Sequence, residues 1–155
     1  ENNKVTEGVI YVPVLEELYY TENGKAMLTI KGGEANEISV NSFKMTDSGL
    51  RLVCSRSHMS DEVKAYVDKF EDPETVSMGS SLKFMLIANN KADIYPRLAP
   101  TMEWDTGAAQ IILEEAGGKV ISEDSKKALI YNKEDLLNPF FIAYLCWHKC
   151  LITER

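Results

Sequence analysis

The stretch that decides the fold runs from residue 50 to residue 70 and reads LRLVCSRSHMSDEVKAYVDKF. Its beginning, Leu50 to Cys54, is mostly apolar and predicts a strand. Ser60 fits a helix N-cap, and two acidic residues follow it, where the helix dipole favours negative charge. The next apolar residues are spaced as on one face of a helix: Val63, Tyr66, Val67 and Phe70. Asp72-Pro73 ends this helix, and a strand followed by a helix is typical of an α/β domain.

The same alternation continues to residue 144. Short strands are predicted over residues 75–78, 92–95, 119–121 and 140–144. One helix begins at Leu82 after Gly79-Ser80-Ser81, and a second runs from about residue 103 to residue 116 and stops at Gly117-Gly118. The apolar stripe predicted for the second helix consists of Trp104, Ala108, Ile111, Ile112 and Ala116. Strands that alternate with helices indicate a layered α/β domain.

Residues 1–45 carry strand patterns only. The runs at 9–12, 18–21 and 26–30 are rich in β-branched and aromatic residues, and Asn23-Gly24 between the last two predicts a hairpin, because both residues tolerate positive φ. We therefore expect three segments. Residues 1–45 form strands of a first, incomplete sheet, residues 46–145 form the α/β domain, and residues 146–155 are a tail without an assigned role.

Composition and charge exclude several classes of protein. The 155 residues include 17 basic and 24 acidic side chains, which gives a formal net charge of −7. This charge argues against a nucleic acid polymer as a partner, because such binding depends on Lys and Arg neutralising phosphates. No apolar run approaches the roughly 20 residues of a membrane-spanning helix. Three scattered cysteines and the lack of a leader predict a reducing, cytoplasmic location, with the inner face of the membrane as an alternative.

Two segments could bind phosphate or metal. Gly79-Ser80-Ser81-Leu82-Lys83 lies at a strand-to-helix turn, where free backbone N–H groups, a hydroxyl and a cation suit a phosphate. Asp105 opens the longer helix, and one carboxylate with phosphate and water is a usual Mg²⁺ site. A serine cap, a solvated lysine and a carboxylate that only complements the helix dipole explain the same residues. Arg97 and His58 are likewise either ligand contacts or surface side chains.

In their order along the chain, these motifs resemble the C-terminal half of the inositol-monophosphatase superfamily. The matching segments are Ser55-Arg56-Ser57-His58, Gly79-Ser80-Ser81-Leu82-Lys83, Tyr95-Pro96-Arg97, Trp104-Asp105-Thr106-Gly107-Ala108-Ala109 and Glu115-Ala116-Gly117-Gly118. Within the superfamily they are most similar to the 3′(2′),5′-bisphosphate nucleotidase branch. The resemblance implies an α/β fold of the layered sugar-phosphatase type, with alternating α and β layers and with its first, metal-site sheet incomplete.

The resemblance also implies roles for five residues. Asp105 is similar to a metal-binding aspartate of the family and would bind Mg²⁺ and substrate in catalysis. Ser80, Lys83 and Arg97 are similar to contacts with the non-scissile part of the nucleotide, and His58 is similar to a contact on the nucleotide side. The monophosphatase branch typically carries an acidic residue in the place of Arg97, so this cation favours a bisphosphate substrate.

The function implied is Mg²⁺-dependent removal of the 3′-phosphate from adenosine 3′,5′-bisphosphate, or from its 3′-phospho-5′-phosphosulfate relative, in sulfur assimilation. The family's other metal ligands, a lone glutamate and an Asp-Pro-x-Asp-Gly-Thr motif, are not found in this sequence. We therefore expect the chain to need an N-terminal half as its partner and to be inactive alone. A homodimer remains open, as do an inositol-phosphate or fructose-bisphosphate phosphatase and a non-catalytic nucleotide-binding remnant.

Overall fold

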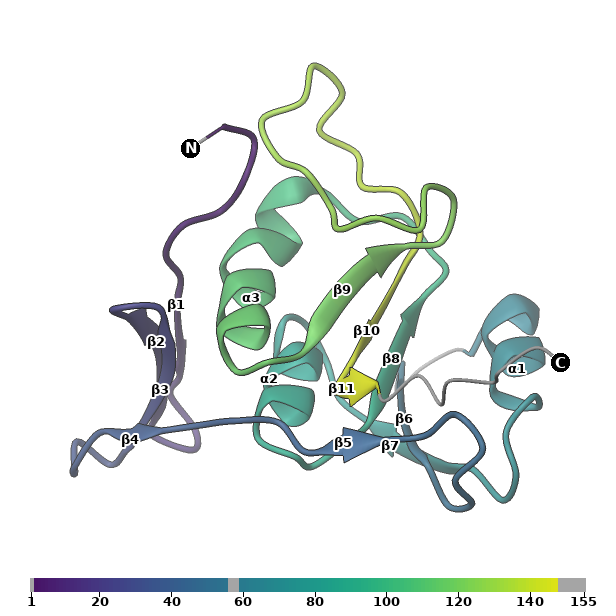
Figure 1. Ribbon diagram of the computed structural model, residues 1–155, viewed down its shortest axis with the longest axis horizontal. Coiled ribbons are helices and arrows are strands. Elements are labelled where there is room, and N and C mark those ends of the chain that lie inside the picture. Colours follow the sequence, from purple (N-terminus) through teal and green to yellow (C-terminus); the bar gives the residue numbers. More distant parts are fainter. Residues whose placement is uncertain (1, 56–58, 148–155) are drawn as a thin grey trace, which may run out of the picture.

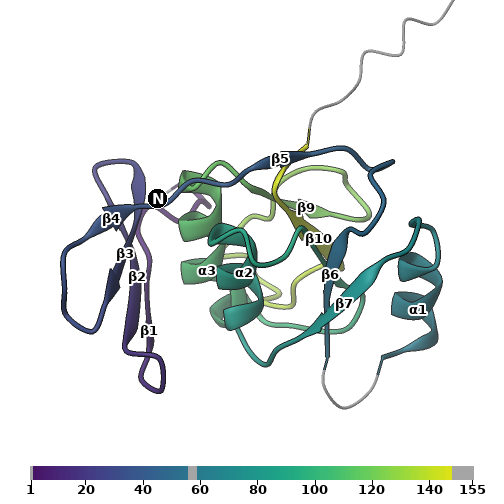
Figure 2. The same cartoon turned by 90° about the horizontal axis from the view of Figure 1, so that it is seen from below.

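The computed structural model describes residues 2–55 and 59–147, which form alternating layers. A four-stranded sheet is the first layer, two helices lie behind it, a five-stranded sheet follows, and a short helix lies on the far side of that sheet (Figure 1; Figure 2). The helices are α1 (Asp61–Val67), α2 (Leu82–Ala88) and α3 (Glu103–Glu115). This arrangement confirms the α/β fold with alternating layers that the sequence predicts.

An antiparallel meander forms the first sheet, in the strand order β1-β2-β3-β4. Its strands are β1 (Val9–Val12), β2 (Glu17–Glu22), β3 (Lys25–Ile30) and β4 (Asn36–Glu37). The hairpin predicted at Asn23-Gly24 is confirmed, because Glu22 pairs with Lys25 and the two turn residues have φ values of 51° and 72°. The short β4 has no counterpart in the sequence prediction.

The second sheet combines parallel and antiparallel pairs in the strand order β7-β6-β8-β10-β9. Its strands are β6 (Arg51–Cys54), β7 (Glu74–Ser77), β8 (Ile94–Arg97), β9 (Lys119–Ser122) and β10 (Phe141–Tyr144). Strand β6 runs parallel to β7 and β8, whereas β10 runs antiparallel to β8 and β9. A small third sheet pairs β5 (Ser42–Phe43) in parallel with β11 (Cys146–Trp147). It connects the segment after the first sheet to the segment after β10.

The predicted limits of one strand are wrong, since β8 begins two residues later than expected and ends at Arg97. Asp93 stands just before β8 because its carboxylate binds Arg51: Oδ1 accepts from Nη2 at 2.6 Å, and Oδ2 accepts from Nε at 3.0 Å. The same Oδ2 accepts the backbone N–H of Arg51 at 2.7 Å. Pro96, which the sequence prediction places after the strand, lies within it although it has no N–H to donate.

Helix α1 is also shorter than predicted. It ends at Val67 with Asp68 as its C-cap, so Phe70 does not belong to the helix. The next N–H groups bond three residues back instead of four, Lys69 to the carbonyl of Tyr66 and Phe70 to that of Val67, which tightens the chain into a turn. The Phe70 ring nevertheless packs on the Tyr66 ring, with 5.6 Å between centroids.

Helix α3 lies between the two sheets and is therefore buried on more than one side (Figure 2). The predicted stripe is right for Ile111, Ile112 and Ala116, which are buried. It is wrong for Trp104, which is 70% exposed because it lies beside a cavity and not against a sheet. Within the described ranges, none of the helices has the length and apolarity needed to cross a bilayer.

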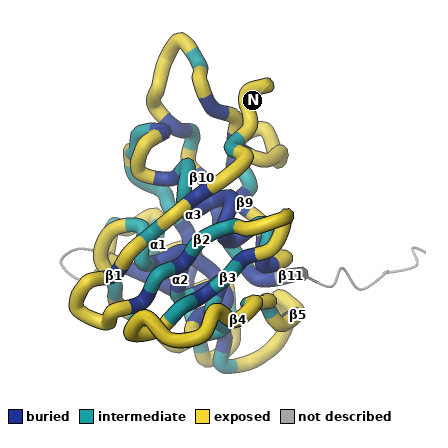
Figure 3. Tube along the Cα trace, turned by 90° about the vertical axis from the view of Figure 1, so that its left-hand side faces the viewer, coloured by how far each residue is buried: buried dark blue, intermediate teal, exposed yellow. Residues whose placement is uncertain are grey.

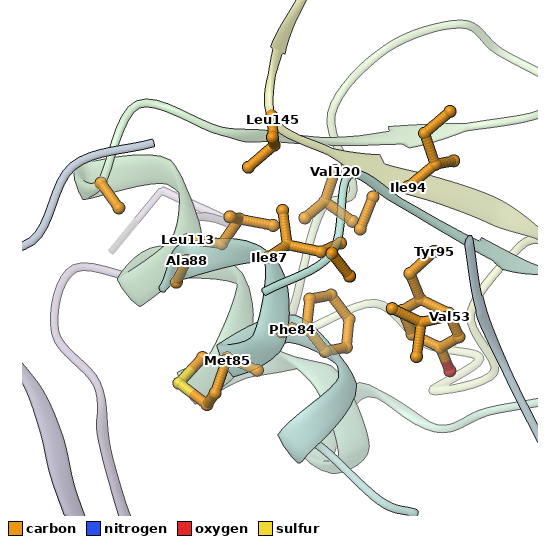
Figure 4. Close-up of a cluster of buried hydrophobic side chains, with 14 of the residues drawn as sticks. Val53, Phe84, Met85, Ile87, Ala88, Ile94, Tyr95, Leu113, Val120 and Leu145 are labelled. Atoms are coloured by element: carbon orange, nitrogen blue, oxygen red, sulfur yellow. The ribbon is translucent and has the colours of Figure 1, made fainter. Parts of the chain in front are cut away.

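The main core lies between α2 and the second sheet (Figure 4). The ring of Phe84 on α2 is its centre: its centroid lies 5.3 Å from that of Tyr95 and 5.7 Å from that of Phe141. Figure 4 labels the surrounding side chains Val53, Met85, Ile87, Ala88, Ile94, Leu113, Val120 and Leu145. This packing fixes α2 against β8 and β10. It thereby also fixes the polar residues next to α2 and β8.

Candidate active site

A cavity of about 450 Å³ opens where the turn before α2, the end of β8 and the first turn of α3 meet. Four of the five residues predicted for the site line it together: Ser80, Lys83, Arg97 and Asp105. These residues are up to 25 positions apart in the sequence, so the tertiary structure brings them together. The fifth, His58, lies outside the described residues.

The turn before α2 is shaped by Ser80, whose φ of 54° is in the left-handed region. This turn carries the chain from β7 into α2, where Lys83 is the second helical residue. The N–H of Lys83 already bonds to the carbonyl of Ser80 at 3.4 Å, and the N–H of Phe84 bonds to that of Ser81 at 3.0 Å. Among the described residues the Ser80 hydroxyl has no bonding partner. The Ser80 hydroxyl is therefore available to a ligand.

Lys83 is a buried cation without a counter-ion in the part of the chain that the structure describes. Its side chain is only 7% exposed, and its ammonium lies 5.4 Å from the centre of the Tyr95 ring. Within residues 2–55 and 59–147 no carboxylate forms an ion pair with it. Burial lowers the pKa of Lys83, and the positive charge of Arg97 lowers it further. A buried charge of this kind is costly unless an anion neutralises it.

Arg97 lies at the end of β8 and brings a second positive charge to the cavity. Its Nη2 donates to the carbonyl of Pro100 at 2.9 Å, while its Nε is buried without an acceptor in the described part of the chain. Burial raises the pKa of Tyr95, and the positive charge of the nearby Arg97 guanidinium partly offsets this rise. Buried N–H groups usually have acceptors, so Arg97 retains donor capacity for a ligand.

Asp105 lies in the first turn of α3 and is exposed. Its Oδ2 accepts the N–H of Met102, the N-cap residue, at 2.9 Å. Its Oδ1 has no bonding partner among the described residues. The two readings of this carboxylate are thus compatible, because one oxygen caps the helix and the other stays available to a cation.

The donor set fits part of a Mg²⁺ site. Mg²⁺ prefers oxygen ligands and usually takes one or two carboxylates, with phosphate and water completing its octahedron. Asp105 supplies one such carboxylate to the cavity, and no cluster of three or more His, Cys, Asp or Glu side chains occurs within the ranges that the structure covers. The remaining ligands of a metal bound here would come from outside these residues.

Sequence reasoning gave no role in the site to Tyr95 and Trp104, two of the residues that line this cavity. Tyr95 was assigned to a strand and to a motif that matches the family, and it precedes Arg97 by two positions, so the two residues share one face of the strand. That spacing was the available signal. Trp104 was assigned to the buried stripe of α3, although its position next to Asp105 places it beside the cavity.

A smaller cavity of about 70 Å³ lies on the other side of the two cations. Lys83, Tyr95 and Arg97 line both cavities, and the smaller one is completed by residues at the end of β6 and the start of α1, among them Ser55 and Ser60. Burial raises the pKa of the neighbouring Cys54 thiol, which disfavours its reactive thiolate. Lys83 and Arg97 therefore line both cavities, and Asp105 lines only the larger one.

Comparison with known proteins identifies the family of this chain. The family model described as the inositol monophosphatase family matches residues 1–149. The chain belongs to the inositol monophosphatase family. This result confirms the superfamily that the motifs resemble.

The curated relatives also agree with the predicted branch. The chain is 38% identical over 141 residues to the 3′(2′),5′-bisphosphate nucleotidase CysQ of Salmonella typhimurium, and 36% identical over 141 residues to the protein of that name from Escherichia coli K12. Each match covers 91% of this chain but 55% of the relative. The chain thus spans about half the length of these relatives.

Solved structures show the same fold. The structure of CysQ from Bacteroides thetaiotaomicron superposes with a TM-score of 0.81 at 37% identity, and the match covers 94% of this chain and 59% of that one. The Thermotoga maritima inositol monophosphatase superposes with a TM-score of 0.66 at 24% identity, covering 93% of this chain and 52% of that one. The second likeness concerns the fold alone.

Proposed function

We propose that this chain forms the substrate-binding part of a Mg²⁺-dependent phosphatase that converts adenosine 3′,5′-bisphosphate to AMP. Its 3′-phospho-5′-phosphosulfate relative would be a second substrate, and sulfur assimilation would be the setting. One observation carries the proposal: Lys83 and Arg97, which form no ion pair with a carboxylate of the described residues, line the same cavity as the exposed carboxylate of Asp105. The similarity to relatives named bisphosphate nucleotidases supports it.

A substrate with two phosphates explains the cations better than one with a single phosphate. In this proposal one phosphate lies near Asp105, and the second needs positive partners of its own. Lys83 contributes a point charge, and Arg97 contributes directed N–H donors that include the buried Nε. An inositol monophosphate has no second phosphate, and it would leave the buried Lys83 and the half-buried Arg97 without an anion.

Each side chain then has a task that follows from its surroundings. Asp105 would hold Mg²⁺ through the oxygen that does not cap α3, whereas Lys83, Arg97 and the hydroxyl of Ser80 would orient the non-scissile phosphate. His58 would contact the nucleotide. When bound, Mg²⁺ would supply an activated water and would neutralise the charge that develops on the scissile phosphate. The buried position of Lys83 keeps bulk water from competing for the phosphate.

We expect the chain to be inactive alone and to dock onto the region that its relatives have in addition. Cross-strand neighbours place apolar residues together on the outer face of the first sheet, where Val9 pairs with Tyr20 and Tyr11 pairs with Leu18. Val9 is 64% exposed and Tyr11 is 56% exposed. Figure 3, which faces this sheet, shows exposed and half-buried residues alternating with buried ones along its strands. An exposed apolar face of this kind suits packing against the additional region of the relatives.

In this proposal, residues 1–45 belong to the sheet that receives the partner region, and residues 46–145 carry the nucleotide site. A cytoplasmic location fits the substrate, which is a soluble nucleotide. The single carboxylate of the described cavity favours one alternative, a remnant that binds nucleotide without catalysis.

The test combines binding and turnover. Calorimetric titration of the purified chain with adenosine 3′,5′-bisphosphate should show tighter binding than titration with AMP or inositol 1-phosphate, and Mg²⁺ should strengthen it. Equal affinities for the three ligands would refute the assignment of the cations. Phosphate release should be absent from the chain alone and present in a chimera that adds the part of the Salmonella relative that this chain does not match. Binding without release by the chimera would establish the remnant.

A further inference from the structure

The loop between β9 and β10 is bonded to the segment that leads into α3. The N–H of Asn138 donates to the carbonyl of Thr101 at 2.8 Å, and the N–H of Glu103 donates to the carbonyl of Leu136 at 3.0 Å. Leu137 and Met102 form an isolated β-bridge between the two segments. The residues that open α3 are therefore held by a loop more than 30 positions away.

Asn138 is the buried polar side chain at the centre of this contact, and it is only 4% exposed. Its Nδ2 donates to the carbonyl of Met102 at 2.9 Å, to Thr106 Oγ1 at 3.0 Å and to Thr101 Oγ1 at 3.3 Å. Its Oδ1 is buried without a partner in the described part of the chain. The side chain therefore acts through its donors, because turning the amide over would leave these acceptors without Nδ2.

The same turn carries Asp105. Met102 is held at its carbonyl by Asn138 and at its N–H by Asp105 Oδ2. Thr106, which directly follows Asp105, also bonds to Asn138. Met102, whose N–H bonds to the Asp105 carboxylate, and Thr106, the next helical residue, thus share one buried amide.

We propose that Asn138 is a positioning residue for Asp105: it fixes Met102 so that Oδ2 stays on the helix cap and Oδ1 remains for the metal. This inference rests on the proposed function, in which Asp105 holds Mg²⁺. Hydrogen-bonded neighbours orient metal ligands in this way, and their loss typically weakens metal binding by roughly 10- to 100-fold. Asn138 itself would touch neither the metal nor the nucleotide.

A matched control lies in the same network. The Tyr131 hydroxyl lies 2.7 Å from Gln110 Oε1 and 3.1 Å from Thr106 Oγ1, and it is buried under the same helix. Tyr131→Phe removes these bonds but leaves the contact between Asn138 and Met102 in place. Asn138→Asp keeps the size of the side chain and replaces the Nδ2 donor with an acceptor that faces the Met102 carbonyl. A purely structural role for Asn138 would give the two variants the same behaviour.

The experiment uses the complete 155-residue chain and Mn²⁺ as a probe for the Mg²⁺ site. Paramagnetic broadening of the Trp104, Asp105 and Thr106 amide signals gives the Mn²⁺ concentration at half effect. We expect Asn138→Asp to raise this concentration about tenfold and Tyr131→Phe to leave it within twofold of wild type. Equal values for Asn138→Asp and wild type, or equal shifts in both variants, would overturn the inference. If Asn138→Asp does not fold, Asn138→Ser replaces it and should likewise raise the Mn²⁺ concentration at half effect.

Hydrogen exchange of the Met102 amide provides a second readout that needs no metal. It should become about tenfold faster in Asn138→Asp and remain unchanged in Tyr131→Phe, because only the first variant releases the peptide that Asp105 caps. If the wild-type chain shows no broadening at Asp105, this carboxylate does not hold Mn²⁺ without ligands from outside the described residues, and the exchange rate alone decides the positioning role. An unchanged rate in Asn138→Asp would refute it.

Discussion

Replacing Lys83 with methionine is expected to make the ligand-free chain more stable and its anion binding weaker. Lys83 is 7% exposed and its ammonium has no carboxylate partner among the described residues, so the folded chain bears the cost of its desolvation. Methionine has a similar shape and no charge. A substitution that removes such a conflict typically adds about 1 kcal/mol to the free energy of unfolding, which corresponds to about 2–4 °C in Tm for a chain of this size.

Lys83→Met should weaken nucleotide binding, although it stabilises the ligand-free chain. One charge-assisted hydrogen bond is worth about 1.5–3 kcal/mol, so Lys83→Met should weaken the affinity for adenosine 3′,5′-bisphosphate by roughly 10- to 150-fold. Scanning calorimetry measures the first change and titration calorimetry the second. Lys119→Met, which removes an exposed lysine from β9, is the control and should alter neither quantity appreciably.

The pH dependence of the Tm difference between Lys83→Met and the wild-type chain identifies the cause of that difference. Burial and then the charge of Arg97 lower the pKa of Lys83 from its ordinary 10.5 in the folded chain. Between the folded pKa and 10.5 the unfolded chain binds more protons, so the free energy of unfolding of the wild-type chain rises with pH across this window. The Tm advantage of Lys83→Met should therefore be full below the folded pKa and disappear above about pH 10.5.

A lower Tm for Lys83→Met together with unchanged nucleotide affinity would refute this reasoning. It would mean that the ammonium stabilises the fold through a partner and does not wait for an anion. A stability gain that stays constant with pH would also count against it, because packing and not charge would then be the cause.

Three further predictions concern the other charge and packing features. Arg97→Glu should reduce turnover of adenosine 3′,5′-bisphosphate by the chimera much more than turnover of a simple monophosphate, and equal losses would contradict the second-phosphate role. Asp93→Asn should lower the free energy of unfolding in urea by about 2–4 kcal/mol, because it leaves the Arg51 guanidinium without its carboxylate; nucleotide affinity should not change. Gly118→Ala should lower Tm, with about 1–3 kcal/mol lost, since its new methyl group would lie 2.8 Å from Leu113 Cγ and 2.9 Å from a backbone carbonyl; an unchanged melting curve would show that Leu113 can move aside.

Local patterns predicted most elements but not all of their limits. The Asn23-Gly24 hairpin and the span of α3 follow from residues that are neighbours in sequence, and both are confirmed. The limits of β8 were wrong, because the position of Asp93 depends on Arg51, 42 residues earlier. The exposure of Trp104 was missed for a related reason, since helical spacing defines a face but not what lies opposite it.

The sequence by itself determined the family, through the order of short motifs, and it named four of the residues that line the cavity, Ser80, Lys83, Arg97 and Asp105. It could not determine that Lys83 is buried without a counter-ion among the described residues, that the Nε of Arg97 has no acceptor among them, or that Asn138 bonds to the turn that carries Asp105. Those facts belong to the tertiary structure, because burial and hydrogen-bond partners depend on which distant segments pack together. The identity of a charged residue does not reveal whether it is solvated or buried. Its neighbours in the folded chain decide whether its charge needs a ligand.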